Sequence, residues 1–318
     1  MLIRTRIELL AVAVLLPRIA TAQRDPDWTA AQQPFRIYGN TYYVGTHGLA
    51  SILVTSPNGH ILIDATLAEN APAIMDHIRT LGFRAEDVKL ILNSHAHYDH
   101  AAGTAAIQSA SGATVAASAW SASVMEHGSS PKDDPQFGLL PDYPPIPNVR
   151  VITDGETLHV GALSLTAHFT PGHTPGGTSW SWESCEADKC LEIVYADSQT
   201  PVSADGFLFS KSNAPAQFQR GFAALEQLRC DILVTPHPGA SSFFERVAAK
   251  TLVDPHACRR YVSIARRAID SFTPTSSSCP RSATSARGSP SRQRSRCRTP
   301  VPPPADPARP TPSAAHRT

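Results

Sequence analysis

The sequence predicts an α/β fold in which two sheets pack face to face and helices cover their outer faces. Between residues 23 and 270, short apolar runs are bounded by Gly, Pro and Asn, the pattern of strands separated by turns. These runs form two sets, each followed by stretches with helical spacing, so sheets and helices are expected to bury each other's apolar faces. With 318 residues, 42% hydrophobic and 17% charged, the chain can build such a core and is not wholly disordered.

The first half of the chain is expected to alternate between strands and helices. Strands are predicted at 42–44, 51–55, 60–64, 88–92 and 114–116. One helix is predicted over 70–81, because Ile74, Ile78 and Leu81 recur at helical spacing and Asn70 can cap its N-terminus. A second helix is predicted over 104–111.

The second half repeats this pattern. Strands are predicted at 149–153, 157–160, 163–169, 177–182, 193–196 and 232–235, and helices at 214–228 and 254–269. Between the halves, the segment 121–148 is long and rich in Gly, Ser and Pro. Loops of this length usually serve a function or are disordered, and we predict a lid over a site.

Both ends are predicted to lie outside the folded domain, which spans residues 23–270. Residues 1–22 have the pattern of a secretory signal peptide, with Arg4 and Arg6 before a short apolar stretch and small residues at Ala20 and Ala22. We therefore expect a periplasmic or secreted protein that is free of the membrane after cleavage. Residues 271–318 are rich in Pro, Ser and Arg and are predicted to form a disordered tail. A change of reading frame near Ser271 is the alternative explanation of this composition.

The charge distribution argues against a nucleic-acid partner. The net charge is +1, but residues 271–318 contain eight Arg and one Asp, so residues 1–270 carry a net charge of −6. Nucleic-acid-binding domains present basic faces, and a mildly acidic domain is not typical of them.

The densest cluster of polar residues directly follows the strand predicted at 88–92. It contains the motif His95-x-His97-x-Asp99-His100, four ligand-type side chains within six residues. Alternate residues of an extended chain point the same way, so His95 and His97 can face one point while Asp99 and His100 face a second one nearby. Imidazole and carboxylate ligands in such an arrangement favour two zinc ions.

Two metal ions need more ligands than this motif supplies, and two further histidines occupy similar settings. His173 lies in the turn Thr170-Pro171-Gly172-His173-Thr174-Pro175, and His237 lies in Thr235-Pro236-His237-Pro238-Gly239, each after a predicted strand. The remaining histidines are assigned to the surface or to ordinary packing: His47, His60, His77, His127, His159, His168, His256 and His316.

Together these motifs resemble the metallo-β-lactamase superfamily, and within it the third subclass of class B β-lactamases, which uses no metal-binding Cys. The likeness extends over about residues 34–269 and includes Tyr195-Ala196-Asp197-Ser198. It implies an αββα sandwich of two mixed sheets. In that family six side chains hold two zinc ions: His95, His97 and His173 would hold the first, and Asp99, His100 and His237 the second.

The resemblance also implies roles for residues around the ligands. Ser198 and Thr200 would contact the substrate carboxylate, although the family often has Ser where this chain has Thr200. Asp64 would orient a ligand histidine from outside the metal shell, or else simply end a strand. Strand alternation lets only one of Asp197 and Ser198 face the site, and the family pattern points to Ser198.

The implied activity is hydrolysis of the β-lactam amide of penicillins, cephalosporins and carbapenems, which confers antibiotic resistance. Zinc lowers the pKa of bound water towards about 7, so a metal-bound hydroxide is available at neutral pH. Asp99 is expected to bind and orient that hydroxide. The expected substrate is a small molecule, and the expected oligomeric state is a monomer.

Six cysteines in an exported chain indicate disulfides. Cys185 and Cys190 bracket a short polar loop, whereas Cys230 and Cys258 resemble a disulfide pair of the family. A metal site at Cys185 and Cys190 is the alternative for the first pair.

Two other functions remain open. A hydrolase of the same fold could act on a thioester, a lactone or another ester. A binding domain with a vestigial site is the non-enzymatic alternative, although the complete set of five His and one Asp argues against it.

Overall fold

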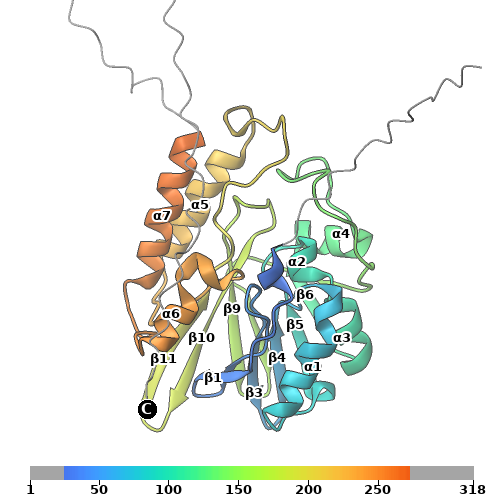
Figure 1. Cartoon of the computed structure of the whole chain (residues 1–318), viewed down its shortest axis with the longest axis vertical. Coiled ribbons are helices and arrows are strands. Elements are labelled where there is room, and N and C mark those ends of the chain that lie inside the picture. Colours follow the sequence, from blue (N-terminus) through green and yellow to red (C-terminus); the bar gives the residue numbers. More distant parts are fainter. Residues whose placement is uncertain (1–24, 273–318) are drawn as a thin grey trace, which may run out of the picture. The chain divides into compact units, whose positions relative to one another are not determined.

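Two mixed sheets lie against each other, and helices cover the outer face of each (Figure 1). The computed structural model describes residues 25–272, so the predicted signal peptide and the tail beyond Phe272 lie outside the described residues. The layers are those of an αββα sandwich, which confirms the predicted fold class.

Within the described residues, the first sheet has seven strands that follow one another in chain order. They are β1 (Phe35–Tyr38), β2 (Thr41–Tyr43), β3 (Ile52–Ser56), β4 (Gly59–Ile63), β5 (Val88–Leu92), β6 (Thr114–Ser118) and β7 (Arg150–Ile152). β1 to β4 pair antiparallel, and β4 to β7 pair parallel. Parallel neighbours need a crossover, which α1 (Ala71–Thr80), α3 (Thr104–Ser111) and α4 (Ala119–His127) provide.

The second sheet has five strands in the described part of the chain, in the order β12-β11-β10-β9-β8. Their bounds are β8 (Thr157–Val160), β9 (Leu163–Phe169), β10 (Thr178–Glu186), β11 (Lys189–Tyr195) and β12 (Ile232–Val234). β11 and β12 are parallel, and α5 (Ala214–Gln227) connects them. The remaining helices are α2 (Tyr98–Ala101), α6 (Phe243–Ala248) and α7 (Ala257–Phe272), the last beside α5.

Three apolar layers hold these elements together. Leu62 on β4 packs with the helices of the first half, whereas its neighbours Ile61 and Ile63 pack between the sheets with Trp180. A third layer lies between the second sheet and α5 and α7, where Phe218 is fully buried. Because both faces of the central strands are covered, successive positions along them are apolar.

Several elements differ from the sequence-based expectation. β1, α2 and α6 were not predicted, and α4 overlaps the start of the predicted lid. The sequence does contain residues typical of helix ends on both sides of α4. The Ser118 hydroxyl accepts a hydrogen bond from the Ser121 amide at its N-terminus, and Gly128 ends the helix with a φ of 73°. Asn70 precedes α1 but does not cap it, because its amide donates to the Trp28 carbonyl and to Thr66 instead.

The second half also departs from the expected boundaries. Cys185 and Cys190 lie opposite each other on β10 and β11 and are joined as a disulfide, so they belong to the strands and not to the loop. A second disulfide joins Cys230 to Cys258. α7 continues to Phe272, two residues past the predicted end of the domain. Among residues 25–272, no helix combines the length and apolar character needed to cross a bilayer.

Candidate metal centre

The predicted metal ligands lie at one edge of the sandwich, where strands of both sheets end. His95 and His97 follow β5, and Asp99 and His100 lie on the short helix α2. Asn93 holds this turn in place, since its backbone amide donates to the Ala116 carbonyl and its side chain donates to the His95 carbonyl.

The second sheet supplies the other two histidines. His173 lies between β9 and β10, in a turn closed by the hydrogen bond from the Thr170 amide to the Gly177 carbonyl. Gly172 has a φ of 151°, and a Cβ atom built on it would lie 2.5 Å from the Phe218 ring, so glycine is required there. His237 comes three residues after the end of β12 and immediately precedes a short 3-10 helix (Pro238–Ser241).

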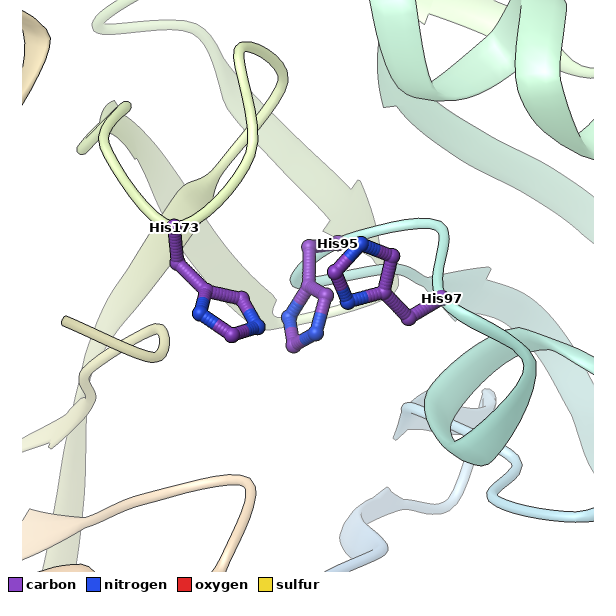
Figure 2. A group of neighbouring side chains, drawn as sticks. All are labelled: His95, His97 and His173. Carbon is purple, nitrogen blue, oxygen red and sulfur yellow. The ribbon is translucent and has the colours of Figure 1, made fainter. Parts of the chain in front are cut away.

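His95, His97 and His173 form the first group of ligand-type side chains, and all three are buried (Figure 2). Their ring centroids form a nearly equilateral triangle with sides of 4.8, 4.9 and 5.0 Å. One ligand nitrogen of each ring lies within 4.8 Å of the others. The two elements that carry them approach from opposite sides, as Figure 2 shows.

Each ring of this group has an oxygen beside the nitrogen that points away from the centre. His95 Nδ1 lies 2.7 Å from Asp197 Oδ1, and His173 Nδ1 lies 2.8 Å from the Thr200 carbonyl oxygen. His97 Nε2 lies 3.0 Å from Asp134 Oδ2. An N–H directed at an oxygen leaves the lone pair on the other nitrogen, and His95 Nε2 is buried without a hydrogen-bond partner.

Burial keeps the imidazoles of His95 and His173 neutral at physiological pH. It lowers the pKa of His95 well below its ordinary value, and the neighbouring histidines lower it further. Burial and the proximity of His97 lower the pKa of His173 to about 3. Neutral imidazole is the form that binds a metal ion.

Asp99, His100 and His237 form the second group. Asp99 Oδ2 lies 3.2 Å from His100 Nε2 and 3.3 Å from His237 Nε2, and those two nitrogens are 3.2 Å apart. Burial alone would raise the pKa of Asp99, but the charges and hydrogen bonds of His100 and His237 outweigh it and hold the pKa well below its usual range. The carboxylate is therefore ionised at neutral pH.

Both groups have the ligand chemistry of a metal site, and the second group also has the spacing of one. Ligand atoms about 2.0–2.1 Å from a tetrahedral zinc ion lie about 3.3 Å from one another, which matches the second group. Burial also raises the pKa values of Asp64 and Asp197, two carboxylates beneath the site. A bound cation would offset the cost of burying these charges.

Asp64 contacts the metal-binding turn more than it contacts a ligand. It accepts hydrogen bonds from the Ser94 amide and hydroxyl at 2.8 and 2.6 Å and from the Tyr195 hydroxyl at 2.8 Å. His100 Nδ1 lies 3.8 Å from its carboxylate, too far for a hydrogen bond. Asp64 thus holds the start of the turn by hydrogen bonds, and it interacts with His100 only electrostatically.

Comparisons with known proteins agree with this geometry. A model of the metallo-β-lactamase superfamily matches residues 45–187. The chain is 52% identical to the solved structure of the Rm3 metallo-β-lactamase, covering 78% of this chain and 96% of that one with a TM-score of 0.77. The chain belongs to the metallo-β-lactamase superfamily. This membership confirms the resemblance drawn from its motifs.

Other solved metallo-β-lactamases are also similar. MEM-A1, a subclass B3 enzyme from a soil metagenome library, is 45% identical over 77% of this chain and 97% of that chain, with a TM-score of 0.76. MIM-1 from Novosphingobium pentaromativorans is 47% identical over 77% of this chain and 91% of that chain, with a TM-score of 0.75. A hydroxyacylglutathione hydrolase from Anaeromyxobacter dehalogenans (strain 2CP-C) is 37% identical over 93 residues, 29% of this chain. The chain spans only 28% of that curated relative.

Of the two adjacent residues left open by the sequence, Asp197 directs its carboxylate at His95, while Ser198 is 4% exposed. Thr200 is exposed, and its hydroxyl lies 3.3 Å from His173 Nδ1. Both Ser198 and Thr200 thus lie in the loop that follows β11 and borders the first histidine group of this superfamily member.

Three residues around the site were not predicted from the sequence. Asp134 and Gln136, in the segment assigned as a lid, are buried against the first histidine group. The Trp28 ring lies 5.6 Å from the His237 ring, and Trp28 comes from the segment before β1. Two adjacent aspartates, Asp133 and Asp134, carried no local signal to separate them.

The remaining metal alternative is not supported. Glu183, Cys185 and Cys190 are close enough to form a ligand group, but their two sulfurs are bonded to each other. His168 lies on β9, five residues before His173, and its Nε2 is 2.9 Å from the Ser181 hydroxyl on β10.

Proposed function

We propose that this chain hydrolyses the amide bond of β-lactam antibiotics, including penicillins, cephalosporins and carbapenems, and so confers resistance to them. The observation that carries the proposal is the meeting of two three-residue ligand groups at one edge of the sandwich. Its similarity to metallo-β-lactamases over more than nine-tenths of their length supports the substrate class.

Two zinc ions are the proposed cofactors. His95, His97 and His173 would hold one ion, and Asp99, His100 and His237 would hold the other. When bound, zinc lowers the pKa of water so that it can attack at neutral pH, and it polarises the lactam carbonyl.

The residues of this chain would prepare the site for that chemistry. Asp197 and the Thr200 carbonyl accept N–H hydrogen bonds from His95 and His173, so both rings are held with a lone pair towards the centre. The ionised carboxylate of Asp99 is proposed to orient the attacking water or hydroxide. Asp64 would keep the turn that carries these ligands in register.

We propose that Ser198 and Thr200 bind the substrate carboxylate. Support comes from the contact of Thr200 with His173, from the place of Ser198 two residues earlier on the same loop, and from the exposure of Thr200, whose hydroxyl can donate a hydrogen bond to an anion. We further propose that the chain acts as a monomer and is exported, with residues 1–22 as the signal peptide.

Hydrolysis of a thioester is the second candidate. The similarity of a 93-residue segment to a hydroxyacylglutathione hydrolase favours it, but that segment covers less than a third of either chain. The broader similarity to metallo-β-lactamases makes the β-lactam the better supported substrate.

Turnover assays with and without a chelator test these alternatives. Purified protein should hydrolyse benzylpenicillin, a cephalosporin and imipenem, lose this activity on chelation and regain it with added zinc. Metal analysis should give about two zinc ions per chain. Chelator-sensitive hydrolysis of S-lactoylglutathione without any lactam turnover would favour the second candidate, and a chain that binds no zinc would contradict both.

A further inference from the structure

Asp134 makes a contact with the metal centre that the roles assigned above do not include. The residue lies in the loop between α4 and β7 and is 1% exposed. Its carboxylate oxygens Oδ2 and Oδ1 lie 3.0 and 3.2 Å from His97 Nε2. A buried carboxylate that receives an imidazole N–H at this distance restricts the orientation of the ring.

The loop itself holds this carboxylate in place. The Gln136 amide donates to Asp134 Oδ1 at 2.8 Å, and the Asp134 amide donates to the Pro131 carbonyl at 3.0 Å. Farther along the loop, the buried Tyr143 hydroxyl donates to the carbonyl of Ala96 at 2.8 Å. Ala96 lies between His95 and His97, so the loop is attached to the metal-binding turn at two points.

His97 presents a different ring nitrogen to the centre from the other two histidines of its group. His95 and His173 present Nε2 to the centre, but His97 turns Nε2 towards Asp134 and therefore presents Nδ1. Gln136 marks this orientation, since its side-chain nitrogen lies 3.4 Å from His97 Nδ1 and 3.3 Å from His173 Nε2. Without an acceptor at Nε2, the imidazole could carry its proton on Nδ1, which would remove the lone pair that faces the centre.

We propose that Asp134 is a positioning residue of the metal centre, which holds His97 with Nδ1 directed at the first metal ion. The segment expected to be a lid is therefore also part of the structure that sets metal affinity. This inference rests on the proposed dinuclear site but not on the identity of the substrate.

Zinc affinity, measured by competition with a chromophoric chelator, tests the proposal on the full chain. Asp134→Ala should weaken one of the two zinc equivalents by about 10–100-fold and leave the other within about twofold of wild type. It should also change the absorption spectrum of the cobalt-substituted protein. Asp142→Asn is the matched control, because Asp142 is an exposed carboxylate on the same loop, and it should bind zinc as wild type does.

The thermal midpoint of the metal-free protein separates positioning from a structural role. Weaker zinc binding at an unchanged midpoint supports the proposal, whereas wild-type affinity for both equivalents overturns it, whatever happens to activity. Should Asp134→Ala fail to fold, Asp134→Leu decides by the same measurement, because it fills more of the space and offers His97 no acceptor oxygen. A wild-type chain that binds no zinc would overturn the proposed function itself, an outcome distinct from failure of the Asp134 variants.

Discussion

Asp197 Oδ1 lies 2.7 Å from His95 Nδ1, and neither side chain has any exposed surface. Asp197 thus supports the first ligand group from behind, while its neighbour Ser198 lies on the loop that borders the site. The two adjacent residues are therefore proposed to have separable roles, Asp197 towards the metal and Ser198 towards the substrate.

Replacing each of these residues should give different kinetic and metal-binding results. Asp197→Ala removes the acceptor for His95 and should lower zinc affinity by about 10–100-fold. Ser198→Ala should keep about two zinc ions per chain and raise KM for a penicillin. Metal analysis after dialysis, together with steady-state kinetics, measures both effects. Full zinc content in Asp197→Ala would contradict the role given to its carboxylate.

His237→Ala should reduce the metal content from about two ions per chain to about one. The substitution removes one of three ligands of the second group, and its side chain is 31% exposed, so the fold should tolerate the change. The loss of kcat/KM should exceed about 10–100-fold, the effect typical of losing a residue that hydrogen-bonds a metal ligand without binding the metal itself. His256→Ala, at an exposed position before α7, is the control for loss of an imidazole and should match wild type.

Gly172→Ala should destabilise the protein and weaken zinc binding together. The new methyl group would meet the Phe218 ring at 2.5 Å, and overpacking of this kind costs about 1–3 kcal/mol. Relief of the clash would move the adjacent His173. Gly239→Ala is the matched control, since a Cβ atom there has no neighbour within 4 Å and His237 is nearby. The free energy of unfolding of Gly239→Ala, measured in urea, should lie within about 0.5 kcal/mol of the wild-type value.

His60 should make the protein less stable in mild acid. Burial lowers the pKa of this histidine below its ordinary value, and its Nδ1 has no hydrogen-bond partner. As the pH falls through about 6.5, the unfolded chain takes up the proton first, so the free energy of unfolding falls. His60→Phe keeps a ring beside Phe83, 5.2 Å away, but cannot titrate. Between pH 7.5 and 5, the free energy of unfolding in urea should therefore fall less for the variant than for wild type. Parallel curves of this free energy against pH would refute the explanation.

Much of the fold could be predicted because its signals are local. The strand Val88–Leu92 and the helix Thr104–Ser111 have the predicted bounds, since each is an apolar or helix-spaced run with clear neighbours on both sides. The candidate ligands could be proposed for the same reason: each lies shortly after a strand, in a turn or a short helix where side chains can converge.

The rest depends on contacts between distant segments. Asp134 lies 37 residues from His97, and no spacing rule relates the two. The edge strand Phe35–Tyr38 is short, and its register is set by β2 rather than by its own pattern. The choice between Asp197 and Ser198 likewise depended on where His95 lies in space, 102 residues earlier in the chain.

The ligand groups divide unequally between the two halves of the sandwich. Each proposed ion would take two ligands from the turn after β5 and one from the opposite sheet, His173 in one case and His237 in the other. Neither half of the sandwich has enough ligands to retain an ion by itself, so each bound ion would link the two halves. Zinc starvation would then loosen the junction of the sheets as well as stop turnover.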